Sequence, residues 1–312
     1  MPKTAGKNPA DYMLPLYING LSGRMLRLPP PKKSKKEFLF VYGHHASLER
    51  YFGFAEYLNK YGGVTAPDLP GFGGMDSFYK IGEKPSLDNL ADYLAAFIKL
   101  RYKGQRFSVL GFSLGFMVVT RMLQKYPQMT KKIEIVSSCA GFVHKDDFRF
   151  KKSSRFIFRW GASIFSNKIP SLIGRYVILI GPFIRIGYRV GEAISFNAKL
   201  ATIDEENRKE RIDFEIRLWH CNDVRTYADI AVTMLKLDLT GKHINLPVYH
   251  VAVEEDHYFD NLSVEQHMRM IYTDFHPFTV KLPAHLPTIL AGAKDAAPYI
   301  PPPLQKVLNK HK

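Results

Sequence analysis

Residues 111–115, Gly-Phe-Ser-Leu-Gly, have the spacing of a turn that presents a nucleophile. A short apolar run at 106–110 precedes them, and apolar residues at helical spacing follow. A serine between a strand and a helix occupies a sharp turn, and glycines two residues to either side remove side chains that would collide there. The first N–H groups of the helix favour negative charge that develops beside the hydroxyl. We therefore predict that Ser113 is a nucleophile, on an elbow formed with Gly111 and Gly115.

A serine hydroxyl is a poor nucleophile until a base removes its proton, so a histidine oriented by a carboxylate is expected later in the chain. Asp256 follows the apolar run 248–253, and His285 follows the run 278–282. The order serine, acid, histidine is expected when all three lie on loops at the carboxyl ends of strands. We predict Asp256 as the acid and His285 as the base. Glu255 and Asp260 remain alternative acids, and His276 is set aside because it precedes the last predicted strand.

Short β-rich runs alternate with longer amphipathic segments along most of the chain. Strands are predicted at 14–17, 24–28, 37–42, 64–66, 106–110, 133–137, 248–253 and 278–282, the first two joined around Asn19-Gly20. Helices are predicted from Leu87, with Ser86 as N-cap and Gly104 as stop, and over 118–126 before Pro127. The alternation predicts an α/β fold with a mainly parallel sheet and helices on both faces.

The interval 144–220 is far longer than a usual connection between a strand and a helix, so we expect it to be a subdomain. It is rich in aromatic residues and in basic residues. We expect most of the aromatic side chains to form its own core and the remainder to line a pocket. The aromatic residues considered are Phe148, Phe150, Phe156, Phe158, Trp160, Phe165, Tyr176, Phe183, Tyr188 and Phe196.

Two further motifs complete a resemblance to the α/β-hydrolase superfamily over nearly the whole chain. The run 42–45, Tyr-Gly-His-His, resembles the oxyanion turn of that family, and 68–73, Asp-Leu-Pro-Gly-Phe-Gly, resembles its D-x-P-G-x-G loop. The resemblance implies the α/β-hydrolase fold, with an oxyanion hole formed by the backbone N–H groups of His44 and Leu114. It also implies a core of residues 1–143 and 221–312 and a helical cap of residues 144–220, inserted after the sixth strand.

The net charge of +15 comes from two stretches. Residues 1–36 hold eight Lys or Arg against one Asp, and residues 145–190 hold ten against two Asp. The most apolar stretch, 169–190, is interrupted by arginines and is not expected to cross a membrane. Two cysteines and an N-terminus without a secretory pattern predict a cytoplasmic protein. The histidines show no metal-ligand spacing, so we expect no metal and no other cofactor.

These residues predict a serine hydrolase that cleaves a carboxylic ester or thioester through an acyl-enzyme. Relatives with aspartate at the elbow form alkyl esters, which Ser113 does not. An aromatic, Ile-rich cap favours an apolar acyl group, and its basic residues add peripheral contact with an anionic membrane, as in a lipase or lysophospholipase. A carbon-carbon bond hydrolase with the same triad stays open, as does a non-catalytic binding protein that uses the basic N-terminal arm and cap. Nucleic acid is not expected as a partner, because no aromatic residues interleave the basic run 29–36.

Overall fold

The structure is a computed structural model that describes residues 7–32, 34–186, 205–282, 285 and 292–310. The strands are β1 Met13–Ile18, β2 Leu21–Leu28, β3 Glu37–Val41, β4 Gly63–Pro67, β5 Phe107–Phe112, β6 Ile133–Cys139, β7 Val248–Val253 and β8 Phe275–Val280. The α-helices are α1 Phe52–Leu58, α2 Leu87–Arg101, α3 Leu114–Lys125, α4 Lys152–Phe165, α5 Lys168–Ile173, α7 Glu205–Cys221, α8 Val224–Met234, α9 Asn261–Ile271, α10 Ala293–Ala296 and α11 Pro302–Lys310. Short 3-10 or π turns are η1 Pro9–Tyr12, η2 Glu49–Tyr51, η3 Phe78–Ile81, η4 Pro127–Lys132, η5 Lys145–Asp147, η6 Gly174–Ile178 and η7 Ala297–Tyr299.

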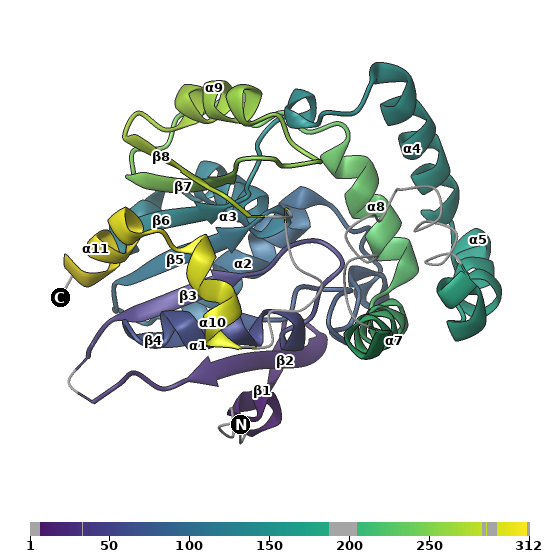
Figure 1. Cartoon of the computed structure of the whole chain (residues 1–312), viewed down its shortest axis with the longest axis horizontal. Coiled ribbons are helices and arrows are strands. Elements are labelled where there is room, and N and C mark those ends of the chain that lie inside the picture. The colour runs from purple at the N-terminus through teal and green to yellow at the C-terminus, as the bar shows by residue number, and fades with distance from the viewer. Residues whose placement is uncertain (1–6, 33, 187–204, 283–284, 286–291, 311–312) are drawn as a thin grey trace.

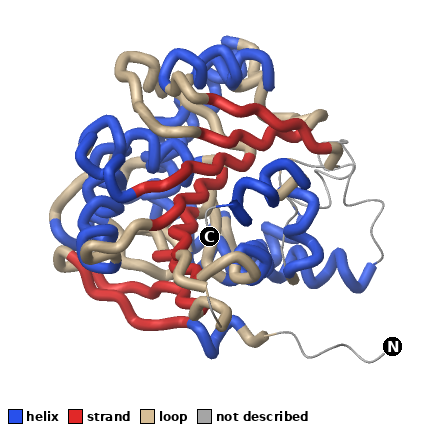
Figure 2. The backbone as a smooth tube through the Cα atoms, turned by 90° about the vertical axis from the view of Figure 1, so that its left-hand side faces the viewer, coloured by secondary structure: helices blue, strands red, loops and turns tan. Residues whose placement is uncertain are grey.

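The strands of the described residues form one sheet in the order β1-β2-β4-β3-β5-β6-β7-β8. The pairs β1/β2 and β2/β4 are antiparallel, and all the other neighbours are parallel. Helices lie on both sides of the twisted sheet (Figures 1 and 2). This confirms the predicted α/β fold. Because β3, β5, β6, β7 and β8 run in the same direction, the loops that follow them gather at one edge of the sheet.

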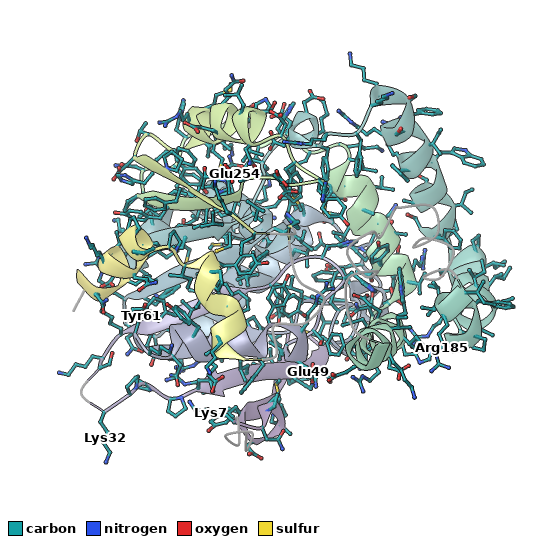
Figure 3. The ribbon with its side chains drawn as sticks, in the orientation of Figure 1. Lys7, Lys32, Glu49, Tyr61, Arg185 and Glu254 are labelled. Carbon is teal, nitrogen blue, oxygen red and sulfur yellow. The ribbon has the colours of Figure 1, made fainter. Side chains whose placement is uncertain are left out.

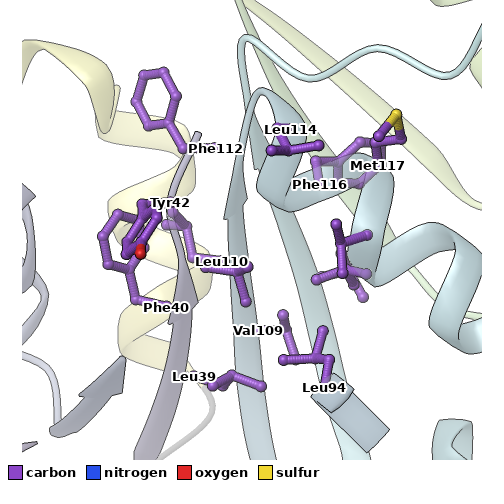
Figure 4. Close-up of a cluster of buried hydrophobic side chains, with 14 of the residues drawn as sticks. Leu39, Phe40, Tyr42, Leu94, Val109, Leu110, Phe112, Leu114, Phe116 and Met117 are labelled. Carbon is purple, nitrogen blue, oxygen red and sulfur yellow. The ribbon is translucent and has the colours of Figure 1, made fainter. Parts of the chain in front are cut away.

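The central strands are apolar on both faces because helices cover both. Every residue of β3, β4 and β5 is buried. Figure 4 shows part of this core, where side chains of β3 and β5 lie beside those of α2 and α3. They include Leu39 and Phe40 of β3, Val109 and Leu110 of β5, Leu94 of α2, and Phe116 and Met117 of α3. Continuous apolar runs of this kind are typical of parallel strands, and they fix the strand ends that carry the candidate site.

The first two strands form the predicted hairpin. Asn19 and Gly20 connect them with φ of 50° and 80°, the left-handed region that asparagine and glycine adopt most readily. At the other edge of the sheet, the predicted strand 278–282 is displaced, because β8 begins at Phe275. His276 therefore lies within the last strand, where its ring stacks on Tyr249, and does not precede that strand as predicted. The apolar alternation of this edge strand is weak, which explains the error.

The helices α4, α5 and α7 and the π turn η6 lie in the segment predicted as the insertion, and α8 follows it, still ahead of β7. In Figure 1 they stand to one side of the sheet, with α4 and α5 at the outer edge. Helix α8 packs against both α4 and α5. Residues 187–204 of the insertion, which include Tyr188 and Phe196, lie outside the described residues. None of the described helices has the length and apolar character needed to cross a bilayer.

Candidate active site

Ser113 lies at the bend between β5 and α3, with φ 46° and ψ −115°. Non-glycine residues rarely adopt positive φ, and such strain costs about 1–3 kcal/mol. The bend is held by the backbone: Ser113 N–H donates to the carbonyl of Cys139 at 3.0 Å, and Phe116 N–H donates to the carbonyl of Ser113 at 3.0 Å. Ser113 itself is partly exposed. The strained backbone thus presents a serine where the chain turns from strand to helix.

The two elbow glycines are required by close contacts. A Cβ at Gly111 would lie 2.6 Å from Cα and 2.7 Å from N of Phe116. A Cβ at Gly115 would lie 2.0 Å from the carbonyl oxygen of Val41 and 2.6 Å from that of Tyr42. The first turn of α3 therefore packs directly on the end of β3, which a larger residue at Gly115 would prevent.

This packing leads to our first prediction. Gly115→Ala should lower the free energy of unfolding by about 3 kcal/mol, because its Cβ meets backbone rather than a flexible side chain. Gly161→Ala in α4 is the matched control, since a Cβ there meets no atom within 4 Å. Removing a glycine from a helix interior should stabilise the chain by about 0.5–1 kcal/mol. Urea unfolding followed by circular dichroism measures both, and equal effects of the two substitutions would contradict the close-packed elbow.

The turn after β3 lies beside Ser113. A Cβ at Gly43 would be 3.4 Å from Cβ of Ser113, so the backbone of this turn passes next to the serine. Tyr42 anchors the turn, because its hydroxyl donates to Oδ1 of buried Asp68 at 2.9 Å and accepts from Leu69 N–H at 2.8 Å. The two motifs read from the sequence, 42–45 and 68–73, are thus one hydrogen-bonded unit at the edge of the site.

His44 contributes no charge to this turn. Burial and the neighbouring His45 lower the pKa of His44 to about 3, so its imidazole is neutral at any ordinary working pH. Its Nε2 lies 3.1 Å from the carbonyl oxygen of Tyr227, a distance at which a neutral ring donates its N–H. Any positive charge that this turn offers to a bound group therefore comes from backbone N–H, not from the His44 ring as an imidazolium.

Asp256 and His285 form a hydrogen bond, although 29 residues separate them. His285 Nδ1 lies 2.5 Å from Oδ2 of Asp256, which is 1% exposed. The other carboxylate oxygen accepts from Tyr258 N–H at 2.8 Å and from Phe259 N–H at 3.2 Å. Because one ring nitrogen is held by the acid, the other is left to act on a substrate or nucleophile.

Burial opposes ionisation of Asp256, but the hydrogen bonds from His285, Tyr258 and Phe259 outweigh it, and the pKa is lowered. A carboxyl group whose pKa is lower in the folded state stabilises the fold above its unfolded pKa. That stabilisation is lost as the pH falls through the folded value. Asp256 is therefore an anion at neutral pH, as a group that orients an imidazole must be.

The His285 ring also lies against the elbow. Its centroid is 6.4 Å from that of Phe112, the residue directly before Ser113, and 5.2 Å from that of Phe259. The structure thus places the predicted nucleophile, oxyanion turn, acid and base at the same edge of the sheet. It separates the alternative acids from this group: Glu255 is exposed, and Oδ1 of Asp260 caps α9 by accepting from Ser263 N–H at 2.9 Å.

Residues of α7 and α8 also reach the oxyanion turn, which the sequence did not indicate. Glu215 of α7 is 8% exposed, and its carboxylate lies 3.3 Å from Nε2 of His45 and 3.8 Å from Nη2 of Arg50. The rings of Trp219 and Tyr227 lie 4.1 Å from His45 and 4.2 Å from His44, respectively. More than 160 residues separate these partners, and no local pattern signals the contact. The rim of the site is therefore aromatic, and Glu215 and Arg50 form an ion pair within it.

His250, which the sequence placed in a strand as a core imidazole, does lie there. Its Nδ1 is 2.9 Å from Oγ of Ser138, and burial lowers its pKa to about 4. Among the described residues, no group of three or more histidine, cysteine, aspartate or glutamate side chains is arranged to hold a metal ion.

Known proteins share this fold. The chain aligns over about 95% of its length with a bromoperoxidase from Bacillus anthracis (15% identity, TM-score 0.64, 98% of that chain). It aligns similarly with a thermophilic esterase from Thermogutta terrifontis (16% identity, TM-score 0.60, 96% of this chain and 98% of that one). A laboratory-evolved potato epoxide hydrolase matches at 14% identity and TM-score 0.65, over 96% and 98% of the two chains. Their activities differ, so these likenesses show the fold alone.

A comparison with curated proteins gave no match. A family match, in contrast, spans most of the chain: residues 32–276 fit the family described as "Serine aminopeptidase, S33". This range includes the oxyanion turn, the elbow and Asp256. The chain therefore belongs to that family and is an α/β hydrolase.

Proposed function

We propose that the protein is a serine hydrolase that cleaves carboxylic esters with an apolar acyl group. The observation that carries the proposal is the hydrogen-bonded pair of Asp256 and His285, whose imidazole lies against Phe112, the residue directly before the strained Ser113. An imidazole held through Nδ1 by an ionised carboxylate is the arrangement that activates a serine hydroxyl. Ligand binding alone does not require such a pair, so the pair supports a catalytic function over the non-catalytic binding protein.

In the proposed reaction, Ser113 Oγ attacks the ester carbonyl carbon while Nε2 of His285 removes the hydroxyl proton. The backbone N–H groups of His44 and Leu114 stabilise the oxyanion that forms on the carbonyl oxygen. His285 then gives its proton to the departing alcohol, which leaves an acyl group on Ser113. A water molecule, deprotonated by His285, then attacks the carbonyl carbon of this acyl-enzyme. This step releases the carboxylic acid product and restores the hydroxyl of Ser113. Asp256 stabilises the imidazolium in both steps.

The aromatic rim supports the choice of an apolar acyl group. Trp219, Tyr227 and Tyr258 lie around the histidines of the site, and a polar substrate would gain little from such surfaces. We propose that residues 144–220 act as a cap over it, because Glu215 and Trp219 of this segment contact the oxyanion turn. The free cysteines, Cys139 and Cys221, are in keeping with a cytoplasmic protein.

Hydrolysis of p-nitrophenyl esters with acyl chains of increasing length tests this function. We expect kcat/KM to rise with chain length, by about 15-fold for each pair of added methylenes that the aromatic rim fully buries. A protein that hydrolyses none of these esters would contradict the proposed reaction. A strict preference for acetate would contradict the apolar acyl site.

A further inference from the structure

The outer face of α4, α5 and η6 is an apolar surface that the described residues leave exposed. Of the 20 large hydrophobic side chains exposed in the described residues, 13 lie between 156 and 186. Helix α4 has no buried residue in the described structure, and Ile157 and Trp160 are each 64% exposed. Ile169 of α5 and Tyr176 of η6 are 71% and 68% exposed. The prediction that these aromatic residues form a core of their own is wrong for Phe156, Phe158, Trp160, Tyr176 and Phe183.

The charged residues of the segment that forms this surface are all basic. Residues 148–186 contain eight Lys or Arg and no Asp or Glu. Some of these cations are used inside the molecule: Arg155 pairs with Asp146, and Arg175 donates to the carbonyls of His220 and Asn222. In the part of the chain that the structure describes, the exposed Lys151, Lys152 and Lys168 have no carboxylate within ion-pair distance. Cations therefore flank the apolar surface and remain available to an external anion.

We propose that the outer face of α4, α5 and η6 docks on an anionic lipid bilayer. The residues that define this docking face are Ile157, Trp160, Ile169, Lys151, Lys152 and Lys168. A bilayer covers both parts of the surface, because acyl chains take the apolar side chains and headgroups take the ammonium groups. A second copy of the chain would bring the same unpaired lysines against these, with no carboxylate from this face between them. An acidic polymer would leave the apolar side chains in water. Figure 3 shows α4 and α5 at the edge of the molecule, with side chains that project outward from them.

The docking face is physically connected to the candidate site. Arg225 Nε of α8 donates to the carbonyl of Ser166, between α4 and α5, at 2.9 Å. Two residues further along α8, the Tyr227 carbonyl lies 3.1 Å from Nε2 of His44. An enzyme docked through α4 and α5 therefore holds its oxyanion turn one helix away from the lipid. The use of docking to deliver an apolar ester rests on the proposed function, whereas docking itself does not.

Co-sedimentation of the full chain with vesicles tests the docking face. We expect binding to phosphatidylcholine vesicles that contain phosphatidylglycerol, weaker binding at raised salt, and little binding to phosphatidylcholine alone. The triple variant Ile157→Ser, Trp160→Ser, Ile169→Ser should lower the partition constant at least about 100-fold. Lys151→Gln, Lys152→Gln, Lys168→Gln should lower it by about 100-fold on the anionic vesicles. Leu262→Ser on α9, where Leu262 is 68% exposed, is the matched control and should bind as wild type does.

The fluorescence of Trp160 gives a second measurement. The chain has two tryptophans, so Trp160→Phe removes the exposed one and leaves Trp219. Anionic vesicles should shift the emission of the wild type to shorter wavelength, and most of that shift should vanish in Trp160→Phe while sedimentation persists.

A folded wild type that sediments with neither kind of vesicle would overturn the proposal. So would a triple apolar variant that binds as well as wild type, which would assign binding to another region such as the basic N-terminal arm. Concentration-dependent dimerisation that the apolar variant abolishes would assign the face to a second copy instead. Activity on a water-soluble ester separates this proposal from the proposed function, because the surface variants should retain it. A chain that binds vesicles but hydrolyses no ester refutes the function and leaves the docking face intact.

Discussion

The Ser113→Ala variant is expected to lose ester hydrolysis, with kcat lowered by about a million-fold. Without the hydroxyl no acyl-enzyme forms, and the oxyanion N–H groups together with substrate binding leave only a small residual rate. Alanine fits the same backbone as well as serine does, so the free energy of unfolding should change by less than about 0.5 kcal/mol. Steady-state kinetics with the best p-nitrophenyl ester, beside urea unfolding, measures both quantities.

Ser108→Ala is the matched control for that experiment. Ser108 lies on the same strand β5, is 6% exposed, and is distant along the strand from its carboxyl end. It should retain kcat within about twofold. Retention of more than about a tenth of wild-type kcat by Ser113→Ala would show that another group attacks the substrate.

The Asp256→Asn variant is expected to lower kcat by about ten-thousand-fold. An asparagine keeps the shape of the side chain, but its neutral amide neither fixes the same His285 tautomer nor stabilises the imidazolium. The N–H groups of Tyr258 and Phe259 both donate to one oxygen of Asp256, which the amide oxygen can replace, so the amide NH2 group then faces Nδ1 of His285 where the acceptor was. Because the carboxylate is ionised at neutral pH, the loss should be seen across the neutral range and not only in acid.

Asp260→Asn is the control for the acid. Asparagine caps a helix as well as aspartate does, so Ser263 N–H keeps its acceptor and both stability and kcat should be preserved. If Asp256→Asn kept nearly full activity while Asp260→Asn or Glu255→Gln lost it, the acid would lie at that other position. His285→Ala should be at least as damaging as Asp256→Asn, since it removes the base itself.

The elbow could be predicted from the sequence because its requirements are local. A Cβ at Gly111 or Gly115 would collide with backbone atoms close to the turn, and strand and helix patterns flank the two glycines directly. Choosing among acids after β7 was harder, since Glu255, Asp256 and Asp260 all follow the strand. Asp260 directly precedes an amphipathic helix, which is the position of an N-cap. Because an N-cap carboxylate is used by the backbone of its own helix, this pattern could have removed Asp260 from the candidate acids.

Other parts of the molecule could not be predicted from single-sequence patterns. The contact of Glu215 with His45 and Arg50 joins an insertion helix to a loop far away in sequence. The aromatic residues of α4 gave a helical pattern, but a pattern does not tell whether a protein layer covers the apolar face. Here no described layer does, and the exposed Trp160 and Phe156 follow from that. The weak alternation of β8 likewise put the predicted start of this strand a few residues too late, so that His276 was predicted to precede it.

Labelling with a fluorophosphonate probe, followed by mass spectrometry of the proteolysed chain, tests the nucleophile most directly. We predict one covalent adduct on the peptide that contains Ser113, formed by the wild type and by Ser108→Ala. Ser113→Ala should form none, and His285→Ala should form it far more slowly. A folded wild type that resists the probe, or an adduct on a different serine, would contradict the account.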